Sequence, residues 1–173
     1  MLKPNHIREI ITRANPYLRR DPDKLQVFLD EGRIACRGAN SLSYEYAYTL
    51  TVIVQDYPHH ADQIIIPLLA YLRAQQPELF ENRDNSAQVI RFDAEFLNHK
   101  TLDLSIQVDL TERVLVKQTE GGLEASYPGE PEHPEYPTKG VVVDVYDRKQ
   151  GNKHLGQFRM PAWDPYGYTE LLK

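Results

Sequence analysis

The sequence has a single cysteine, Cys36, among its 173 residues. One cysteine excludes a disulfide within the chain, and the sequence therefore fits a reducing compartment. There is no excess of basic residues either, because 20 Lys and Arg stand against 25 Asp and Glu, for a net charge of −5. This balance argues against broad binding to nucleic acid or to an anionic membrane surface.

Long apolar runs are also missing. The longest run extends from Ile64 to Leu72 and contains Pro67 and Tyr71, which makes it about half of a membrane span. The beginning, MLKPNHIREIITRA, is charged and lacks the apolar centre of a signal peptide. With 41% hydrophobic and 26% charged residues, we expect a soluble globular chain that stays where it is made.

Catalytic signatures are missing as well, since no CxxC, HExxH, GxSxG or Gly-rich phosphate loop occurs. The most ligand-like cluster is His59-His60 followed by Asp62. Adjacent histidine side chains diverge, so a metal site here needs further ligands from elsewhere. We interpret the cluster as a polar loop entering a helix, with a small metal-dependent hydrolase as the remote alternative. We predict no catalytic residue, no cofactor and no metal.

A long alternation is the most prominent feature that is present. In the stretch SLSYEYAYTLTVIVQDY (41–57), every second residue from Leu42 to Val54 is apolar or aromatic. This spacing predicts a long half-buried strand. Its first half is tyrosine (Tyr44, Tyr46, Tyr48) and its second half is aliphatic. Tyrosine rings with polar tips suit a boundary, so we expect this half near the end of the core or against a neighbouring subunit.

Other segments predict two helices and three hairpins. Ile7, Ile10, Ile11 and Ala14 follow helical spacing after Pro4, and an apolar helical face recurs over 62–75. Strands are predicted over 25–29 and 34–37 around a DEGR turn, over 89–96 and 102–110, and over 141–146 and 153–158. Val114 and Val116 extend the fourth of these strands after a bulge. The acids on the opposite face of the second hairpin mark a solvated sheet surface: Asp93, Glu95, Asp103 and Asp109.

Together these elements predict an α+β fold, with a mainly antiparallel β-sheet packed with two helices and a C-terminal β-hairpin extension. We divide the chain into a core (1–118), a linker rich in proline and acids (119–140), and a C-terminal hairpin with an aromatic arm (141–173). The arm contains Trp163, Tyr166 and Tyr168, which dock either on a partner or on the chain's own core. Glu112 and Arg113 pair either across a subunit boundary or, as we favour, on the surface.

Four segments read together resemble a known family: LQVFLDEGRIACRGANSLS (25–43), the long alternation (41–57), IIIPLLAYLRAQQPELF (64–80) and LDLSIQVDLTERVLV (102–116). In their order and spacing they resemble the tail completion protein R family (GpR) of contractile-tailed temperate phages and prophages. The resemblance covers roughly residues 1–118. It implies a structural, non-enzymatic protein that is made in the bacterial host cytoplasm. Its place in the virion is the head-proximal end of the tail.

The resemblance also implies a function similar to that of tail terminators, which are α+β proteins that assemble as six-fold rings. The implied partners are further copies of the chain, the tail tube or sheath protein, and head–tail connector proteins. DNA would pass through without specific binding, and no membrane is involved. A head–tail adaptor or a tail assembly factor is the alternative.

A strand over 42–55 would be about 45 Å long at roughly 3.3 Å per residue, more than one small core covers. Part of it is therefore expected to reach a neighbour. The candidate interface residues are Tyr44, Tyr46, Tyr48, Glu112, Arg113, Trp163, Tyr166 and Tyr168.

Overall fold

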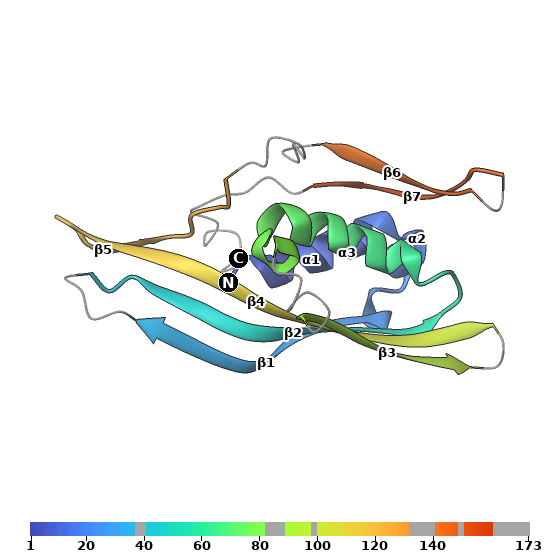
Figure 1. Ribbon diagram of the computed structural model, residues 1–173, viewed down its shortest axis with the longest axis horizontal. Coiled ribbons are helices and arrows are strands. Elements are labelled where there is room, and N and C mark those ends of the chain that lie inside the picture. Colours follow the sequence, from blue (N-terminus) through green and yellow to red (C-terminus); the bar gives the residue numbers. More distant parts are fainter. Residues whose placement is uncertain (37–40, 82–88, 98–99, 132–140, 149–150, 161–173) are drawn as a thin grey trace.

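The computed structural model describes residues 1–36, 41–81, 89–97, 100–131, 141–148 and 151–160. Figure 1 shows three layers: a main antiparallel sheet, a helical layer, and a two-stranded hairpin on the far side of the helices. The predicted α+β class is confirmed. In chain order the elements are α1 (Lys3–Ala14), α2 (Pro16–Arg20), the 3-10 turn η1 (Pro22–Lys24), β1 (Leu25–Cys36), β2 (Tyr44–Tyr57), α3 (Asp62–Gln75), α4 (Glu78–Glu81), β3 (Ile90–Leu97), β4 (Thr101–Thr119), β5 (Gly122–Ser126), β6 (Val142–Asp147) and β7 (Lys153–Arg159).

The main sheet has the strand order β1-β2-β4-β3, and every neighbouring pair is antiparallel. With 19 residues, β4 is the longest strand. One side of β4 pairs with β2 from Leu102 to Val114. Its other side pairs with β3 as far as Val108 and with β5 from Leu115 onward. The centre of β4 is therefore bordered by a strand on one side only among the described elements.

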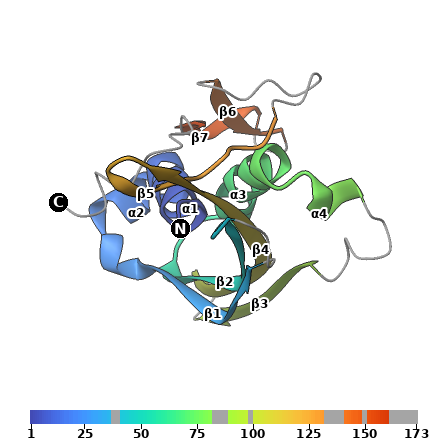
Figure 2. The same ribbon diagram turned by 90° about the vertical axis from the view of Figure 1, so that its left-hand side faces the viewer.

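The predicted alternation places one apolar face of the sheet beneath the helices. On β2, Leu50, Val52 and Val54 are fully buried and oppose Val108, Ile106 and Leu104 of β4. Helices α1 and α3 lie on this inner face in both views (Figures 1 and 2). The two helices contribute seven side chains to the same core: Ile7, Ile10, Ile11, Ile64, Leu68, Tyr71 and Leu72.

The hairpin predicted over 25–37 does not form. Instead β1 is one strand along β2, with a register shift between Asp30 and Arg33. Glu31 has a φ of 51°, so the DEGR segment makes a bulge rather than a turn. The 14-residue strand β2 is long enough to pair with both halves of β1, and this pairing outweighs the local turn signal. Arg37 lies outside the described residues.

Two predictions for the middle of the chain are also corrected. No bulge interrupts β4 before Val114, because its register with β2 is continuous from Leu104 to Val114. The first part of the segment predicted as a linker is instead structured, since β5 pairs with the end of β4 and Tyr127 beyond it is buried. Gly122, with a φ of 132°, makes the turn between them. Residues 132–140 lie outside the described residues.

The predicted C-terminal hairpin is present as β6 and β7. It packs on the helical layer, because Val145, Phe158 and Met160 are buried in the main core cluster. Gly156 lies so close to α1 that a Cβ atom there would be 2.4 Å from the Ala14 carbonyl oxygen. The hairpin is thus seated directly on α1. The arm that follows, with Trp163, Tyr166 and Tyr168, lies outside the described residues.

Candidate functional site

A buried carboxylate holds the beginning of α1 against the sheet. Glu112 occupies an inward position of β4 and is 3% exposed. It accepts hydrogen bonds from the backbone N–H groups of Leu2 (2.7 Å) and Lys3 (3.3 Å), and from the hydroxyl of Tyr48. Unpaired N–H groups and the positive end of the helix dipole meet at a helix N-terminus, which favours a carboxylate there. Glu112 is therefore a helix cap supplied by a strand.

The surroundings of Glu112 are polar but closed. Lys3, 3% exposed, donates from Nζ to the side-chain oxygen of Gln76, and Gln76 donates to Thr111 Oγ1 at 2.9 Å. Burial lowers the pKa of Lys3. Burial and the nearby Glu112 carboxylate raise the pKa of Tyr48 far above its usual value. We call Glu112, Tyr48, Lys3 and Gln76 the charged cluster.

A second polar cluster holds the other end of α1. Asn15, 1% exposed, donates from Nδ2 to the carbonyls of Ile11 (2.9 Å) and Gln63 (3.1 Å). The Tyr57 hydroxyl donates to Asn15 Oδ1 and lies 2.8 Å from the Gln63 side-chain oxygen. Burial raises the pKa of Tyr57. We call Asn15, Tyr57 and Gln63 the neutral cluster.

The neutral cluster also explains how α3 tolerates Pro67. Proline has no N–H, so the carbonyl four residues earlier loses its helical partner. That carbonyl belongs to Gln63, and it receives the hydrogen bond from Asn15 instead. Pro67 itself is buried and lies inside α3.

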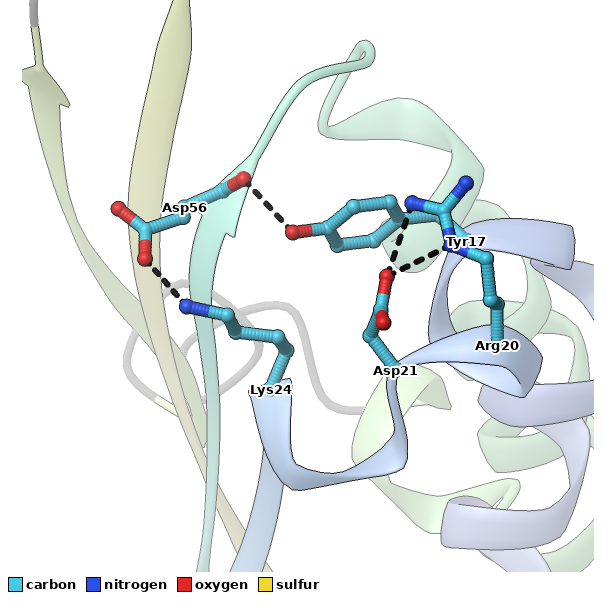
Figure 3. Close-up of polar contacts among 5 residues, drawn as sticks. All are labelled: Tyr17, Arg20, Asp21, Lys24 and Asp56. Atoms are coloured by element: carbon cyan, nitrogen blue, oxygen red, sulfur yellow. Dashed lines mark hydrogen bonds and ion pairs between the residues drawn. The ribbon is translucent and has the colours of Figure 1, made fainter.

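A third set of polar contacts ties the α2–β1 connection to the end of β2 (Figure 3). Lys24 forms an ion pair with Asp56 at 2.5 Å, and the Tyr17 hydroxyl donates to the Asp56 carbonyl at 3.1 Å. Arg20 pairs with Asp21 and lies 5.5 Å from the centre of the Tyr17 ring. These groups face solvent, and the hydrogen bond to Asp56 raises the pKa of Lys24. The contacts anchor this connection to the sheet.

The outer face of the sheet carries the acids that were predicted to be solvated. Asp109 accepts a bidentate pair from Arg91 at 3.0 and 3.1 Å and a hydrogen bond from Thr49 at 2.7 Å. The hydrogen bond from Arg91 is the main reason why the pKa of Asp109 is lowered. Asp103 accepts from the Asp56 backbone N–H at 2.7 Å. Asp109 and Asp103 thus have structural partners on a wet surface.

A groove of about 400 Å³ opens beside the centre of β4. Its lining is mixed, and the contributing residues include Arg33, Ala47, Thr49, Gln76, Asp109 and Thr111. The groove lies where β4 has neither β3 nor β5 beside it. There Gln76 approaches the strand edge, with its side-chain oxygen 3.4 Å from the Thr111 N–H. The groove follows from this break in strand pairing.

The histidine cluster is open to solvent. His60 pairs with Asp62 at 3.1 Å, while the ring of His59 packs edge-on against Tyr57 and Tyr17. Within the residues that the structure describes, no group of three or more His, Cys, Asp or Glu side chains is placed to hold a metal ion.

The predicted interface residues do not form one surface. Tyr44 and Tyr46 are half-buried and pack on a small cluster of Leu2, Val114 and Tyr127 beyond the main core. Arg113 is exposed on the outer face, opposite Glu45. In contrast, Tyr48 and Glu112 point into the subunit and hydrogen-bond to each other. The favoured surface pairing of Glu112 is therefore wrong, and the candidate interface among described residues narrows to Tyr44, Tyr46 and Arg113.

One exposed apolar surface was missed. On β3, Phe92 and Phe96 are 65% and 80% exposed, although both lie on the inner face, opposite Ile106 and Leu102. The alternation identified the face correctly, but the helices do not cover this edge of the sheet. The signal that could have found the surface is the pair of charges between the two phenylalanines, Asp93 and Glu95, which suits an edge strand.

None of the helices in the described part of the chain is long and apolar enough to cross a membrane.

Comparison with known proteins gives a specific match. The family model described as P2 phage tail completion protein R (GpR) matches residues 1–131. The chain is 40% identical over 145 residues to "Tail completion protein R" of Escherichia phage P2, which covers 84% of this chain and 94% of that relative. No solved structure matches significantly.

Proposed function

The chain belongs to the P2 phage tail completion protein R family, and from this membership we propose that it caps the head-proximal end of a phage tail. It is a structural component of phage tail completion and works with other tail and head components. We propose further that it acts as a ring of copies on the last turn of the tail tube or sheath. The ring would stop tail growth and present a surface to the head–tail connector proteins.

The observation that carries this proposal is the family match, which extends through β5 to residue 131. The fold is compatible with it, because the main sheet ends in two different strands, β1 and β3. Two unlike edges suit head-to-tail contacts, which close into a ring when the rotation between subunits closes. The net charge of −5 is compatible with DNA passing through without being held. Assembly would take place in the bacterial host cytoplasm.

The direct test deletes the gene from an inducible prophage and restores it on a plasmid. We expect lysates without the protein to contain filled heads and unjoined tails in electron micrographs, some with abnormal length. Plasmid expression should restore joined particles and infectious titre. Normal joined particles in the deletion lysate would overturn the proposal.

A second measurement separates a tail cap from a head–tail adaptor or an assembly factor. Mass spectrometry of purified virions and of isolated tails shows where the protein resides. A cap is present in tails that have not met a head. An adaptor is present in virions or heads alone, and an assembly factor is present in neither.

A further inference from the structure

The main sheet extends past the helical layer at one end, where β5 lies (Figure 1). This end is built from the last residues of β1, the first residues of β2, the last residues of β4, and β5. Its inner face is apolar and only partly covered. We call it the tyrosine face, and it consists of Ile34, Tyr44, Tyr46, Val116 and Leu123.

The tyrosine face offers aliphatic and aromatic surface to a partner. Ile34 and Leu123 are 66% and 64% exposed at its two borders, on β1 and β5. Between them, the half-buried rings of Tyr44 and Tyr46 pack edge to face, with their centres 5.0 Å apart. Their hydroxyls are hydrogen-bonded to each other at 3.0 Å. An aromatic pair of this kind favours further aromatic side chains packed against it.

The last described strand, β7, leads toward the tyrosine face. Gly156 of β7 lies against Ala14, the last residue of α1, and Figure 1 shows β7 running from there back toward the beginning of α1. Four strand residues advance about 13 Å, whereas the 12 residues of α1 span about 18 Å. Met160 therefore lies over the first turns of α1. Leu2, just before α1, belongs to the cluster on which the tyrosine face packs.

The arm that follows Met160 has the length and the composition to cover this face. Residues 161–173 can span up to about 43 Å at roughly 3.3 Å per residue. They include Trp163, Tyr166 and Tyr168, followed by two leucines. Two prolines favour an extended backbone, which spaces these side chains along the arm.

We propose that the arm docks on the tyrosine face of its own chain, with Trp163 packed against Tyr44 and Tyr46. The arm begins beside this face, and such a short tether gives a high effective concentration, which favours a contact within one chain over a contact with a second copy. The tyrosine face is then closed in the free chain, and a partner that uses it must first displace the arm. The inference does not depend on the proposed function.

A single tryptophan makes the docking measurable. Trp163 is the only tryptophan of the chain, so the tryptophan fluorescence of the purified full-length protein reports on the arm alone. We expect the folded protein to emit at a shorter wavelength than the protein unfolded in urea, because the docked indole is removed from water. Iodide should also quench the folded protein less than the unfolded protein.

Charges placed on the tyrosine face should release the arm. In the variant that combines Ile34→Asp with Leu123→Asp, both changes are at exposed positions, and the emission should shift toward that of the unfolded chain. A second variant, Tyr44→Ser with Tyr46→Ser, removes the rings themselves and should give the same shift. Thermal melting followed by circular dichroism shows that each variant is folded.

The matched control is Phe92→Asp combined with Phe96→Asp on β3, where the two side chains are 65% and 80% exposed. Phe92 pairs with Ile106, which is ten residues, or about 33 Å along β4, from Val116 of the tyrosine face. This control should leave the emission unchanged. A shift with the control as large as with the two tyrosine-face variants would show that the arm docks elsewhere.

A mixing experiment separates the chain's own arm from the arm of a second copy. An acceptor chain with Trp163→Ser, Tyr166→Ser and Tyr168→Ser keeps the tyrosine face but has no tryptophan and no aromatic side chain on the arm. It is unfolded and refolded in excess together with the chain that carries Ile34→Asp and Leu123→Asp. Emission that stays at the longer wavelength supports docking within one chain. A return to the shorter wavelength would mean that the arm docks on a second copy, and the proposal would be wrong.

The proposal also fails if the folded wild type emits and is quenched like the unfolded chain, because the arm is then not docked. These measurements use the purified chain and no phage tails. A failure of the proposed function would therefore leave them unchanged, and a free arm would leave the proposed function unchanged.

Discussion

The two ends of α1 are held to the same sheet in opposite ways. At its beginning, the charged cluster uses a buried carboxylate, Glu112, that takes up backbone N–H groups of Leu2 and Lys3. At its end, the neutral cluster uses a side-chain amide, Asn15, that serves carbonyls of Ile11 and Gln63. The charged cluster places a negative group at the positive end of the helix. The neutral cluster supplies hydrogen-bond donors to the carbonyls at the other end and carries no net charge.

The difference has an energetic consequence. A buried ion is costly when any partner is removed, because the remaining charge or donor has lost both water and its hydrogen bond. When a partner of a buried amide is removed, only hydrogen bonds between neutral groups are lost, and the cost is smaller. The beginning of α1 should therefore be the more fragile end, although both ends contain fully enclosed side chains.

The largest expected effect comes from Glu112→Ala. The change leaves the N–H groups of Leu2 and Lys3 and the hydroxyl of Tyr48 without their acceptor, and we expect the free energy of unfolding to fall by about 3–5 kcal/mol. Urea denaturation followed by circular dichroism measures it. The exposed Glu124→Ala is the matched control and should change the value by less than about 0.5 kcal/mol. A loss below about 1 kcal/mol for Glu112→Ala would contradict the capping role.

Asn15→Ala should come next, with a loss of about 1–3 kcal/mol, because it leaves the carbonyls of Ile11 and Gln63 without a donor. A double-mutant cycle with Pro67→Ala sharpens this, since alanine restores an N–H that can reach the Gln63 carbonyl. We expect Asn15→Ala to cost less in the Pro67→Ala background than in the wild type. Additive costs would show that Asn15 does not compensate the proline. Exposed Asn5→Ala serves as the control.

A smaller effect is expected for Tyr57→Phe, which removes one hydroxyl from the neutral cluster. The loss should be about 1 kcal/mol, because the Asn15 side chain is buried and its Oδ1 atom loses the hydrogen bond from this hydroxyl. Tyr17→Phe is the comparison, since its hydroxyl donates to the Asp56 carbonyl at an exposed site. If both changes lower the free energy of unfolding by the same amount, the burial of the neutral cluster adds nothing to the strength of its hydrogen bonds.

The smallest effect is a pH dependence that comes from three buried tyrosines: Tyr48 of the charged cluster, Tyr57 of the neutral cluster, and Tyr71 of α3. The pKa values of Tyr48, Tyr57 and Tyr71 are raised in the folded chain, mainly by burial. A group of this kind contributes stability that is complete below its unfolded pKa of about 10 and is lost as the pH rises toward the folded value. The lowered pKa of Lys3 acts in the opposite direction over the same range. We therefore expect unfolding free energy to fall by about 1 kcal/mol or less between pH 8 and pH 10.

The variants test the source of that loss. In urea titrations at both pH values, Tyr57→Phe should reduce the difference between pH 8 and pH 10, because one ionisable hydroxyl is gone. Tyr17→Phe should leave the difference unchanged. A stability that rises over this range would mean that Lys3 outweighs the three tyrosines.

Most elements of the fold could be predicted from periodicity. The alternation over 41–57 and over 102–110, and the helical spacing in 7–14 and 62–75, correspond to β2, β4, α1 and α3. These patterns are long, and each buries a whole face, so local sequence and tertiary packing agree. The DEGR segment was misread because a bulge and a turn use the same residue types, and only the length of β2 decides between them.

The polar clusters could not be predicted in the same way. Glu112 stands in the alternation between Leu110 and Val114 at an inward position, and the pattern alone suggests an interruption there. The carboxylate of Glu112 can be buried at this position because it accepts hydrogen bonds from two backbone N–H groups some 110 residues away in the sequence. The link between Asn15 and Pro67 likewise joins two elements that only the fold brings together. The exposed phenylalanines of β3 were assigned to the correct face, but sequence does not say how far the helices extend over it.

Glu112 has one more consequence, which concerns how β4 finds its place. Strand β4 alternates so regularly that a slip of two residues along β2 would keep apolar side chains facing the helices. Such a slip would carry Glu112 away from the start of α1. At its new position the carboxylate would be enclosed but would lack the N–H groups of Leu2 and Lys3. Only one alignment satisfies this side chain. We infer that Glu112 selects the correct pairing of the two longest strands during folding, as a single polar residue can do within a repetitive apolar seam.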